Sequence, residues 1–283
     1  MELEKDNWDI IIRPRNRRFT LNLKEVWQYR DLLMMYIKRD IVTMYKQTVL
    51  GPLWFVIQPL FTVFTYFFIF GKIAQISTDS LPPILFYLSG NMAWAYFSEC
   101  LGRTSGTFLG NAGVFSKVYF PRLVVPIAAS ISTLVKFGIQ LALFIIIYTY
   151  YDITGANIYP TIYLLLFPVL VIMLAFMGIG FGLVISSITT KYRDLALFFG
   201  FITQLWMYAT PIIYPLSTIP EKYRWIVELN PLTSIIESMK YGLMGEGTFS
   251  WISLGYSFCF MAIILLIGIF MFNKAERNFI DVI

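Results

Sequence analysis

The chain has 283 residues and a formal net charge of +5; 58% of its residues are hydrophobic and only 14% are charged. In soluble domains roughly a quarter of all residues are charged, so this composition excludes an ordinary soluble protein. Histidine is absent, and the two cysteines, Cys100 and Cys259, lie inside apolar runs. Neither a metal site built from Cys and His nor a disulfide framework is therefore expected.

The first 48 residues are polar and basic, and they contain no cleavable signal pattern. Within them, residues 13–18 read RPRNRR. Such a run could bind nucleic acid or anionic lipid, but beside a membrane span it is typical of a basic arm that fixes topology. We therefore expect residues 1–48 to lie on the cytoplasmic side and to bind no nucleic acid.

A helical pattern begins at Asn22, which fits an N-cap with Glu25 as its capping-box partner. Apolar residues then recur at steps of three and four, namely Val26, Tyr29, Leu33, Ile37, Ile41 and Met44. This spacing gives one apolar stripe opposite a charged face. The sequence thus predicts an amphipathic helix in the plane of the cytoplasmic membrane interface.

Six later stretches are long enough to cross a hydrocarbon core, which takes about 20 helical residues. They lie near 50–71, 83–103, 126–150, 161–188, 195–214 and 251–272. The second is the least apolar, because Asn91 and two prolines dilute it. The chain is therefore predicted to be an all-α membrane protein whose residues 49–283 form one transmembrane domain.

The distribution of basic residues predicts the orientation. Ten of the 22 lysines and arginines lie in residues 1–50, and most of the others follow the second or fourth span or lie in the C-terminal tail. Because Lys and Arg gather in short cytoplasmic loops, both termini are predicted to be cytoplasmic.

Few charged residues fall inside the spans. Glu99 precedes Arg103 by four residues, a spacing that places both on one helix face and favours a local ion pair. Lys136 lies well inside the third span, and an ionisable residue at that depth is a functional-site hypothesis. It either faces an internal cavity and attracts an anionic group, or it pairs with Glu99.

Aromatic residues make up 18% of the chain and crowd residues 54–70 and 86–97, which include Trp54, Trp94 and Tyr96. Sugars bind well to aromatic faces, so these runs could line a path for a glycan. Lipid-facing belts and helix packing explain such residues equally well.

Residues 114–126, VFSKVYFPRLVVP, interrupt two apolar stretches and are cytoplasmic on this topology. Their apolar and basic side chains fall on neighbouring helical positions, namely Val114, Phe115, Lys117, Val118, Tyr119 and Arg122. We expect a short helix over 114–122, limited by Pro121. It either docks in a groove of a partner protein, where aromatic and Arg residues are enriched, or lies on anionic lipid.

Residues 211–249 are too long for a turn and too apolar for a solvated loop, and four prolines divide them. Asn230 and Pro231 predict a helix start, followed by a helix over 232–243 that ends at Gly245. A helix this short cannot span, and irregular backbone at membrane depth must be buried in protein or line a cavity. We expect two short helices that dip back from the outer surface, or else an ordered external hairpin.

The sequence holds no motif for catalysis. No stretch matches the phosphate-binding loop GxxxxGK[ST], and nucleophile pairs that need histidine are excluded. The GIGFG run at 178–182 is best explained by small residues that let helices approach closely. No catalytic residue is therefore predicted.

Several segments resemble the membrane subunits of ABC-2 type polysaccharide exporters, the permeases for O-antigen, capsule and teichoic acid. The segments are RDIVTMYKQTVLGPLWFVIQPL, KVYFPRLVVP, YRD at 192–194, NPLTSIIE at 230–237 and the terminal AERNFIDVI. They follow the family's order and cover nearly the whole chain. YKQTVLG together with KVYFPR is quite specific, whereas NPLT alone is weak.

The resemblance implies six spans per subunit, a homodimer and two copies of a separate ATP-binding subunit. ATP and Mg would lie on that partner, with no cofactor on this chain. The family passes undecaprenyl-diphosphate-linked glycans across the bacterial inner membrane. The alternatives are an ABC-2 exporter of drugs or other lipids, and an integral membrane glycan-modifying enzyme, which the absent histidine and scarce buried carboxylates disfavour.

The resemblance also implies roles for particular residues. The cytoplasmic coupling helix, which docks on the ATPase, corresponds to Lys117, Tyr119, Phe120, Pro121 and Arg122. The interface helix and its junction with the first span contain Arg39, Asp40, Tyr45 and Lys46. The outer gate helices contain Pro215, Asn230 and Pro231.

On this hypothesis, ATP closes the partner dimer, the coupling helices move with it, and two permease copies separate to open a path along their shared interface. The diphosphate of the lipid needs cations near the cytoplasmic access point. The candidates for access and path are Arg39, Lys46, Arg103, Lys136, Trp54, Trp94 and Tyr96.

Overall fold

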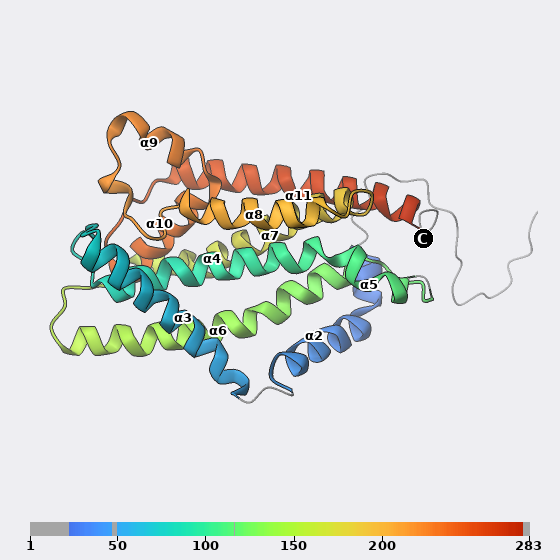
Figure 1. Cartoon of the computed structure of the whole chain (residues 1–283), viewed down its shortest axis with the longest axis horizontal. Coiled ribbons are helices and arrows are strands. Elements are labelled where there is room, and N and C mark those ends of the chain that lie inside the picture. The colour runs from blue at the N-terminus through green and yellow to red at the C-terminus, as the bar shows by residue number, and fades with distance from the viewer. Residues whose placement is uncertain (1–22, 47–49, 116, 280–283) are drawn as a thin grey trace, which may run out of the picture.

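The computed structural model describes residues 23–46, 50–115 and 117–279. In these residues the fold is built from helices, and the longest of them run side by side along one axis (Figure 1). The all-α fold class predicted from the sequence is thus confirmed for the described part of the chain. The basic run at 13–18 and the predicted N-cap at Asn22 lie outside it.

The long helices of the bundle follow the predicted spans in order. They are α3 (Trp54–Tyr66), α4 (Pro83–Ser105), α6 (Val124–Ile153), α7 (Phe167–Thr189), α8 (Leu195–Tyr208) and α11 (Trp251–Phe279). Tighter or wider turns extend two of them, namely the 3-10 turn η1 (Gly51–Leu53) before α3, the π-helix η2 (Phe67–Ile73) after it, and the 3-10 turn η3 (Ile162–Leu166) before α7.

Short helices lie at the two ends of the bundle (Figure 1). One end, which we name the α5 end, holds α1 (Leu23–Gln28), α2 (Arg30–Tyr45), α5 (Thr107–Phe115) and the C-terminal turns of α11. The opposite end, the α10 end, holds the 3-10 turn η4 (Leu216–Thr218), α9 (Glu221–Glu228) and α10 (Pro231–Met244).

Four helical segments of the described chain are long and apolar enough to cross a membrane. They are Gly51–Ile73, Val124–Ile153, Ile162–Thr189 and Trp251–Glu276. The predicted second and fifth spans correspond to α4, which is long enough but more polar, and to α8, which is apolar but has only 14 residues.

The polar composition of α4 follows from its place in the bundle. It packs against α3, α6, α7 and α8, and most of its side chains are buried, including Tyr87, Asn91 and Phe97. Because other helices surround it, α4 does not need the continuous apolar surface that lipid contact demands. This is why hydropathy alone marked it as the weakest of the predicted spans.

Small residues of α7 let it approach its neighbours, as the GIGFG run predicted. A Cβ atom on Gly182 would lie 2.4 Å from Cβ of Thr104, and one on Gly178 would lie 2.8 Å from Cβ of Cys100. On the other side of α7, a Cβ on Gly180 would lie 3.0 Å from the backbone nitrogen of Leu265 in α11. These three close approaches need glycine at positions 178, 180 and 182.

Gly182→Ala is therefore expected to destabilise the chain. Its methyl group would overlap Thr104, and overpacking of this kind costs about 1–3 kcal/mol, or several degrees in melting temperature. Gly138→Ala in α6 is the matched control, because no heavy atom lies within 4 Å of the added Cβ. Thermal melting of the purified protein should separate the two variants; equal melting temperatures would contradict the packing described here.

The predicted fifth span ends earlier than expected. The sequence placed it at 195–214, whereas α8 ends at Tyr208 and residues 209–213 are not helical. Pro211 disfavours helical geometry in the residue before it, and it has no N–H to continue the ladder. The irregular segment then passes close to α4, where a Cβ on Gly90 would lie 3.1 Å from the Ile212 carbonyl oxygen.

The helix predicted after Asn230 is confirmed. The Asn230 side chain accepts a hydrogen bond from the Leu232 N–H at 3.1 Å, Pro231 occupies the first turn, and Gly245 ends α10 in the left-handed conformation with φ 78°. The sequence thus contained both signals for this helix, the cap and the stop.

A buried charge pair, Lys240 with Glu237, holds α10 in place. This pair is not predicted from the sequence. Lys240 is fully buried; its Nζ donates to the Pro211 carbonyl at 2.7 Å, lies 3.4 Å from Oε1 of Glu237 and lies 3.8 Å from the centre of the Phe86 ring. Lys240 therefore satisfies a carbonyl of the irregular 209–213 segment, which joins α10 to α4 and to the end of α8.

The predicted N-terminal helix is broken in two. α1 ends at Gln28 and α2 begins at Arg30, with Tyr29 at a non-helical ψ of 25° between them. Within the predicted stripe, Val26 and Ile37 are buried in a cluster that also contains Phe120. The stripe therefore packs on the protein, and α2 lies against α6.

Candidate functional site

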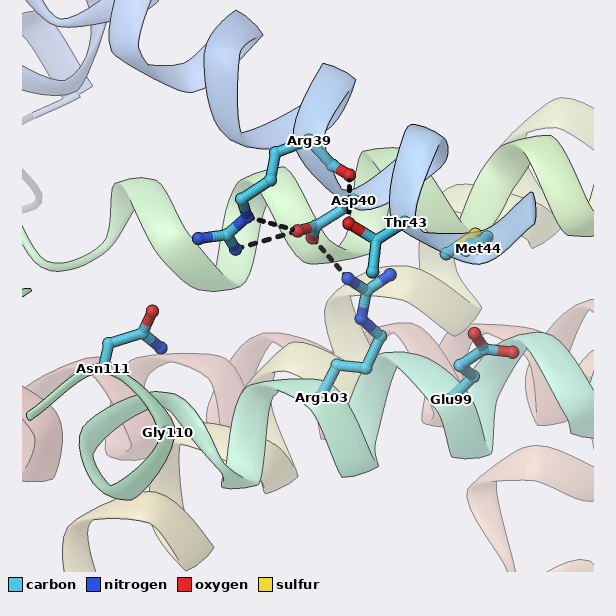
Figure 2. A pocket seen from close by; sticks show the side chains of 8 residues that line it. All are labelled: Arg39, Asp40, Thr43, Met44, Glu99, Arg103, Gly110 and Asn111. Atoms are coloured by element: carbon cyan, nitrogen blue, oxygen red, sulfur yellow. Dashed lines mark hydrogen bonds and ion pairs between the residues drawn. The ribbon is translucent and has the colours of Figure 1, made fainter. Parts of the chain in front are cut away.

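A charged pocket of about 680 Å³ opens at the α5 end, between α2, the end of α4 and α5 (Figure 2). Its lining is mostly polar and charged: Arg39, Asp40, Thr43, Met44, Glu99, Arg103, Gly110 and Asn111. Three of the predicted site residues, Arg39, Asp40 and Arg103, are thus brought together from helices that are far apart in sequence.

The Asp40 carboxylate is the centre of the pocket's ionic network (Figure 2). Its Oδ1 accepts two hydrogen bonds from Arg39, at 3.0 Å from Nε and 2.8 Å from Nη2. Its Oδ2 accepts from Nη2 of Arg103 on α4. Asp40 is nearly buried, and bonds of this kind between charged groups are about twice as strong as neutral ones.

A serine of α6 completes the network. Nη1 of Arg103 donates to Oγ of Ser132 at 2.9 Å, and that hydroxyl oxygen lies 3.5 Å from Oδ2 of Asp40. Through these contacts, α2, α4 and α6 are joined at one point. The sequence carried no signal for the role of Ser132, because a serine inside an apolar span is common.

A second ion pair joins α4 to α6 beside the pocket. Nζ of Lys136 lies 2.8 Å from Oε2 of Glu99. Of the two roles open for Lys136, pairing with Glu99 is confirmed. The predicted local pair of Glu99 with Arg103 is wrong, because Arg103 extends toward α2, where Asp40 offers a more buried carboxylate.

The charges around the pocket suit a small anion. Arg39, Arg103 and Lys136 carry three positive charges, and Asp40 and Glu99 carry two negative charges. Each guanidinium has five N–H donors, of which the contacts above use two. Planar guanidinium donors match the oxygens of phosphate or carboxylate, so the remaining donors can bind such a group.

The two other predicted residues of the interface helix have different positions. Lys46 follows the last turn of α2, is exposed and does not line the pocket. The side chain of Tyr45 lies outside the described part of the chain. The structure therefore groups Arg39 with Arg103 but not with Lys46.

The short helix predicted at 114–122 is displaced. The helix of this connection is α5, which ends at Phe115, and residues 117–123 form turns and irregular backbone. Pro121 disfavours helical geometry at Phe120, so the helix cannot continue through this segment. The N–H groups of Lys117 and Val118 bond to the Val114 carbonyl and close the end of α5.

Two of the predicted coupling residues are buried in the chain itself. Phe120 packs against Phe115 and Tyr36, with ring centres 5.5 Å and 6.0 Å away. Arg122 donates to the Glu276 backbone carbonyl at 2.8 Å, and its Nε lies 3.6 Å from that residue's carboxylate. Both residues hold the 117–123 segment on the bundle, so in this conformation their side chains are not presented to a partner.

The environment of Arg122 is consistent with this internal role. Burial lowers the pKa of its guanidinium, while the Glu276 carboxylate beside it acts in the opposite direction. The guanidinium carbon also lies 5.3 Å from the centre of the Phe115 ring. Arg122 thus links the connection before α6 to the C-terminal turns of α11.

The residues just before Phe120 are the ones that face outward. Val118 and Tyr119 are 58% and 72% exposed, and Lys117 is exposed beside them. Pro121 is half-buried. We name Val114, Lys117, Val118 and Tyr119 the exposed tip; three of its four side chains are exposed apolar groups.

Of the aromatic residues proposed for a glycan path, two are buried and one is half-exposed. Trp94 and Tyr96 are buried in the core, where Trp94 packs against Trp206 and Tyr96 packs against Phe137. In this conformation they do not line an open path, because α4 is surrounded by other helices. Trp54, at the start of α3, is half-exposed.

At the α10 end, Asn230 joins two helices. Its Oδ1 accepts from Nε1 of Trp206 at 3.1 Å, and its Nδ2 donates to Oγ1 of Thr210 at 2.8 Å. Pro231 is buried behind it, and Pro215 is also buried, just before η4. Asn230 thus caps α10 and fastens it to the end of α8.

Among the described residues, no group of three or more His, Cys, Asp or Glu side chains is placed to hold a metal ion.

Comparison with known proteins extends this description. A family model described as ABC-2 type transporter matches residues 31–244, which include the pocket, the exposed tip, α9 and α10. The chain is 29% identical to the O-antigen export system permease protein RfbA of Klebsiella pneumoniae over 256 residues, covering 89% of this chain and 95% of that protein.

Two further relatives have related names. The polysialic acid transport protein KpsM of Escherichia coli is 24% identical over 84% of this chain and 91% of its own length. The capsule polysaccharide export inner-membrane protein CtrC of Neisseria meningitidis serogroup B is 21% identical over 88% of this chain and 92% of its own length.

Proposed function

The chain belongs to the ABC-2 type transporter family, and from this premise we propose that it is the membrane-spanning permease subunit of a polysaccharide exporter. The observation that carries the proposal is the similarity to proteins named as O-antigen export permeases over 89% of the chain. The relatives named for polysialic acid and capsule export support the same cargo class. The subunit transports and does not catalyse.

The cargo we propose is a glycan linked to a lipid through a diphosphate, with O-antigen as the leading candidate. Such a headgroup is strongly anionic and would need cationic donors where it enters. The pocket beside Arg39 and Arg103 offers unused guanidinium donors, and a net positive charge results only when the neighbouring Lys136 is counted with the four charged residues of the lining. Lys136 forms an ion pair with Glu99 and would thereby neutralise that carboxylate beside the site.

We propose that the α5 end faces the cytoplasm and the α10 end faces outward. Lys117, Arg122, Lys191, Arg193 and Lys274 all lie in connections or helix ends at the α5 end. An excess of Lys and Arg marks the cytoplasmic side of a membrane protein. With α4 and α8 counted as crossings, the chain would make six spans in the bacterial inner membrane with both termini cytoplasmic.

On this orientation, η4, α9 and α10 form the outer gate. α10 is too short to cross the membrane; its buried Lys240 and the half-buried cap residue Asn230 donate to backbone carbonyls of the irregular segment beside it. This is the arrangement required for non-helical backbone at membrane depth. We propose that α9 and α10 dip back from the outer surface.

We propose that two copies of the chain assemble with two copies of a separate ATP-binding subunit, which would hold ATP and Mg; no cofactor is proposed on this chain. The exposed tip supports a contact with that subunit, because three large apolar side chains at a cytoplasmic end need a partner surface. Nucleotide-driven motion of the partner would then reach α5 and α6 through this connection.

The experiment that tests the proposed function is purification of the tagged chain from native membranes, with identification of the proteins that accompany it. We expect an ATP-binding subunit in equal amount. A chain that purifies without such a subunit and modifies a glycan by itself would overturn the transporter and support a membrane enzyme.

A further inference from the structure

The carboxylate of Asp40 is shared by the two guanidinium groups of the pocket. Arg39 bonds to Oδ1 and Arg103 bonds to Oδ2, so the two planes approach the carboxylate from different sides (Figure 2). The hydroxyl of Ser132 lies 3.5 Å from Oδ2 but has a shorter bond, of 2.8 Å, to the Ala129 carbonyl, so the two guanidinium groups are the main partners of this carboxylate. Asp40 therefore determines where both guanidinium groups lie.

The three side chains differ in how far they reach toward solvent. Asp40 is 9% exposed, whereas Arg103 is 27% exposed and Arg39 is 53% exposed. The carboxylate therefore lies behind the two guanidinium groups. An anion that enters from solvent meets their unused N–H donors before it meets the repulsive charge of Asp40.

Two roles for Asp40 follow from this geometry. It could compete with an incoming anion and leave when the anion binds, or it could stay and hold the arginines for the anion. Leaving would strand a buried carboxylate without partners, which is strongly unfavourable. Staying neutralises one of the two arginines and keeps the other charge available.

We infer that Asp40 is a positioning residue, which holds Arg39 and Arg103 as a clamp for one anionic group of the phosphate class. The inference rests on the proposed function, in which this pocket accepts the diphosphate of the lipid-linked cargo. Groups that orient a binding side chain from behind are a general requirement for tight, specific sites.

The clamp also ties anion binding to the position of one helix. Asp40 and Arg39 are on α2, whereas Arg103 is on α4 and Ser132 is on α6. Only when α2 lies against α6 do both guanidinium groups face the same pocket. The access site would therefore be complete in this docked arrangement and would come apart if α2 moved away.

The test measures the binding of farnesyl diphosphate to the full chain, purified with its ATP-binding subunit in lipid nanodiscs. Asp40→Asn is expected to weaken binding by about tenfold or more, the effect of losing charge-assisted hydrogen bonds, although the pocket becomes more positive. Arg103→Lys keeps the charge but loses the planar fork, and we expect a loss of similar size.

Asp31→Asn is the matched control. It removes the same charge from the same helix, but its side chain is almost fully exposed and pairs loosely with Arg30 at 4.0 Å. Its affinity for the probe should equal that of the wild type. If Asp40→Asn does not fold, Ser132→Ala replaces it, with an expected loss of about threefold for one weaker hydrogen bond.

A combined variant separates positioning from bulk charge. When Arg39 and Arg103 are both changed to Gln, adding Asp40→Asn should cause no further loss, because Asp40 acts through these two side chains. Equal or tighter binding by Asp40→Asn alone would overturn the inference and make Asp40 a competitor. Absence of binding by the wild type would instead remove the headgroup site itself, and with it the inference, while co-purification of the ATP-binding subunit would still support the transporter.

Discussion

Lys240→Met is expected to prevent the chain from accumulating as a folded protein. The substitution leaves Glu237 buried without its cation and leaves the Pro211 carbonyl without its donor. Removing one partner of a buried pair costs about 3–5 kcal/mol, a large part of the stability of a typical domain. The measurement is thermal unfolding in detergent, followed by the fraction of monodisperse protein on size-exclusion chromatography.

Two comparisons make this result specific. Lys222→Met removes an exposed lysine from α9, so we expect a change within about 0.5 kcal/mol. The double variant Lys240→Met with Glu237→Leu should recover part of the loss, because it leaves no unpaired charge. If Lys240→Met melted at the same temperature as Lys222→Met, the buried pair would not hold α10 in place.

Val118→Asp combined with Tyr119→Asp is expected to abolish association with the ATP-binding subunit while the chain stays folded. Both side chains belong to the exposed tip. Aromatic residues at the centre of an interface often contribute about 2 kcal/mol or more each to the free energy of binding. Introducing two negative charges adds desolvation cost at the same place. The measurement is the amount of ATP-binding subunit that co-purifies with the tagged chain.

Tyr223→Asp at the opposite end is the control, because Tyr223 is comparably exposed on α9. It should leave the association unchanged. Arg122→Glu is a second comparison; it should also lose the partner, but through unfolding, because Arg122 is bonded to Glu276 inside the chain. Stoichiometric co-purification with the Val118 and Tyr119 double variant would place the docking surface elsewhere.

The predictions that succeeded depend on local chemistry. The cap at Asn230, the first-turn proline and the left-handed Gly245 each act within a few residues, so the sequence was sufficient to place α10. The small residues at 178–182 likewise predicted close helix approach, because glycine has few other reasons to recur in an apolar span.

The predictions that failed depend on which helices are neighbours. Phe120 and Arg122 fit a docking surface by residue type, but the fold places Phe115 and Glu276 against them and buries them. Trp94 fits a glycan path or helix packing equally well by residue type, but α4 is surrounded by other helices and Trp94 is buried. In each case the decisive contact joins residues far apart in the chain.

The pocket was predicted only in part. Arg39, Asp40 and Arg103 were each singled out from the sequence, yet nothing in their spacing showed that one carboxylate joins both arginines. Ser132 and Lys240 were missed as partners, although Glu237 precedes Lys240 by three residues, a spacing that favours an ion pair on a helix.

A polysaccharide export permease must move its glycan across the membrane. The most direct measurement is deletion of its gene in the native host, followed by separate assays of surface polysaccharide and of lipid-linked glycan inside the cell. We predict that surface polysaccharide is lost and the lipid-linked glycan accumulates at the inner membrane, and that the wild-type gene restores export. Unchanged surface polysaccharide, or a glycan that is no longer synthesised at all, would contradict the account.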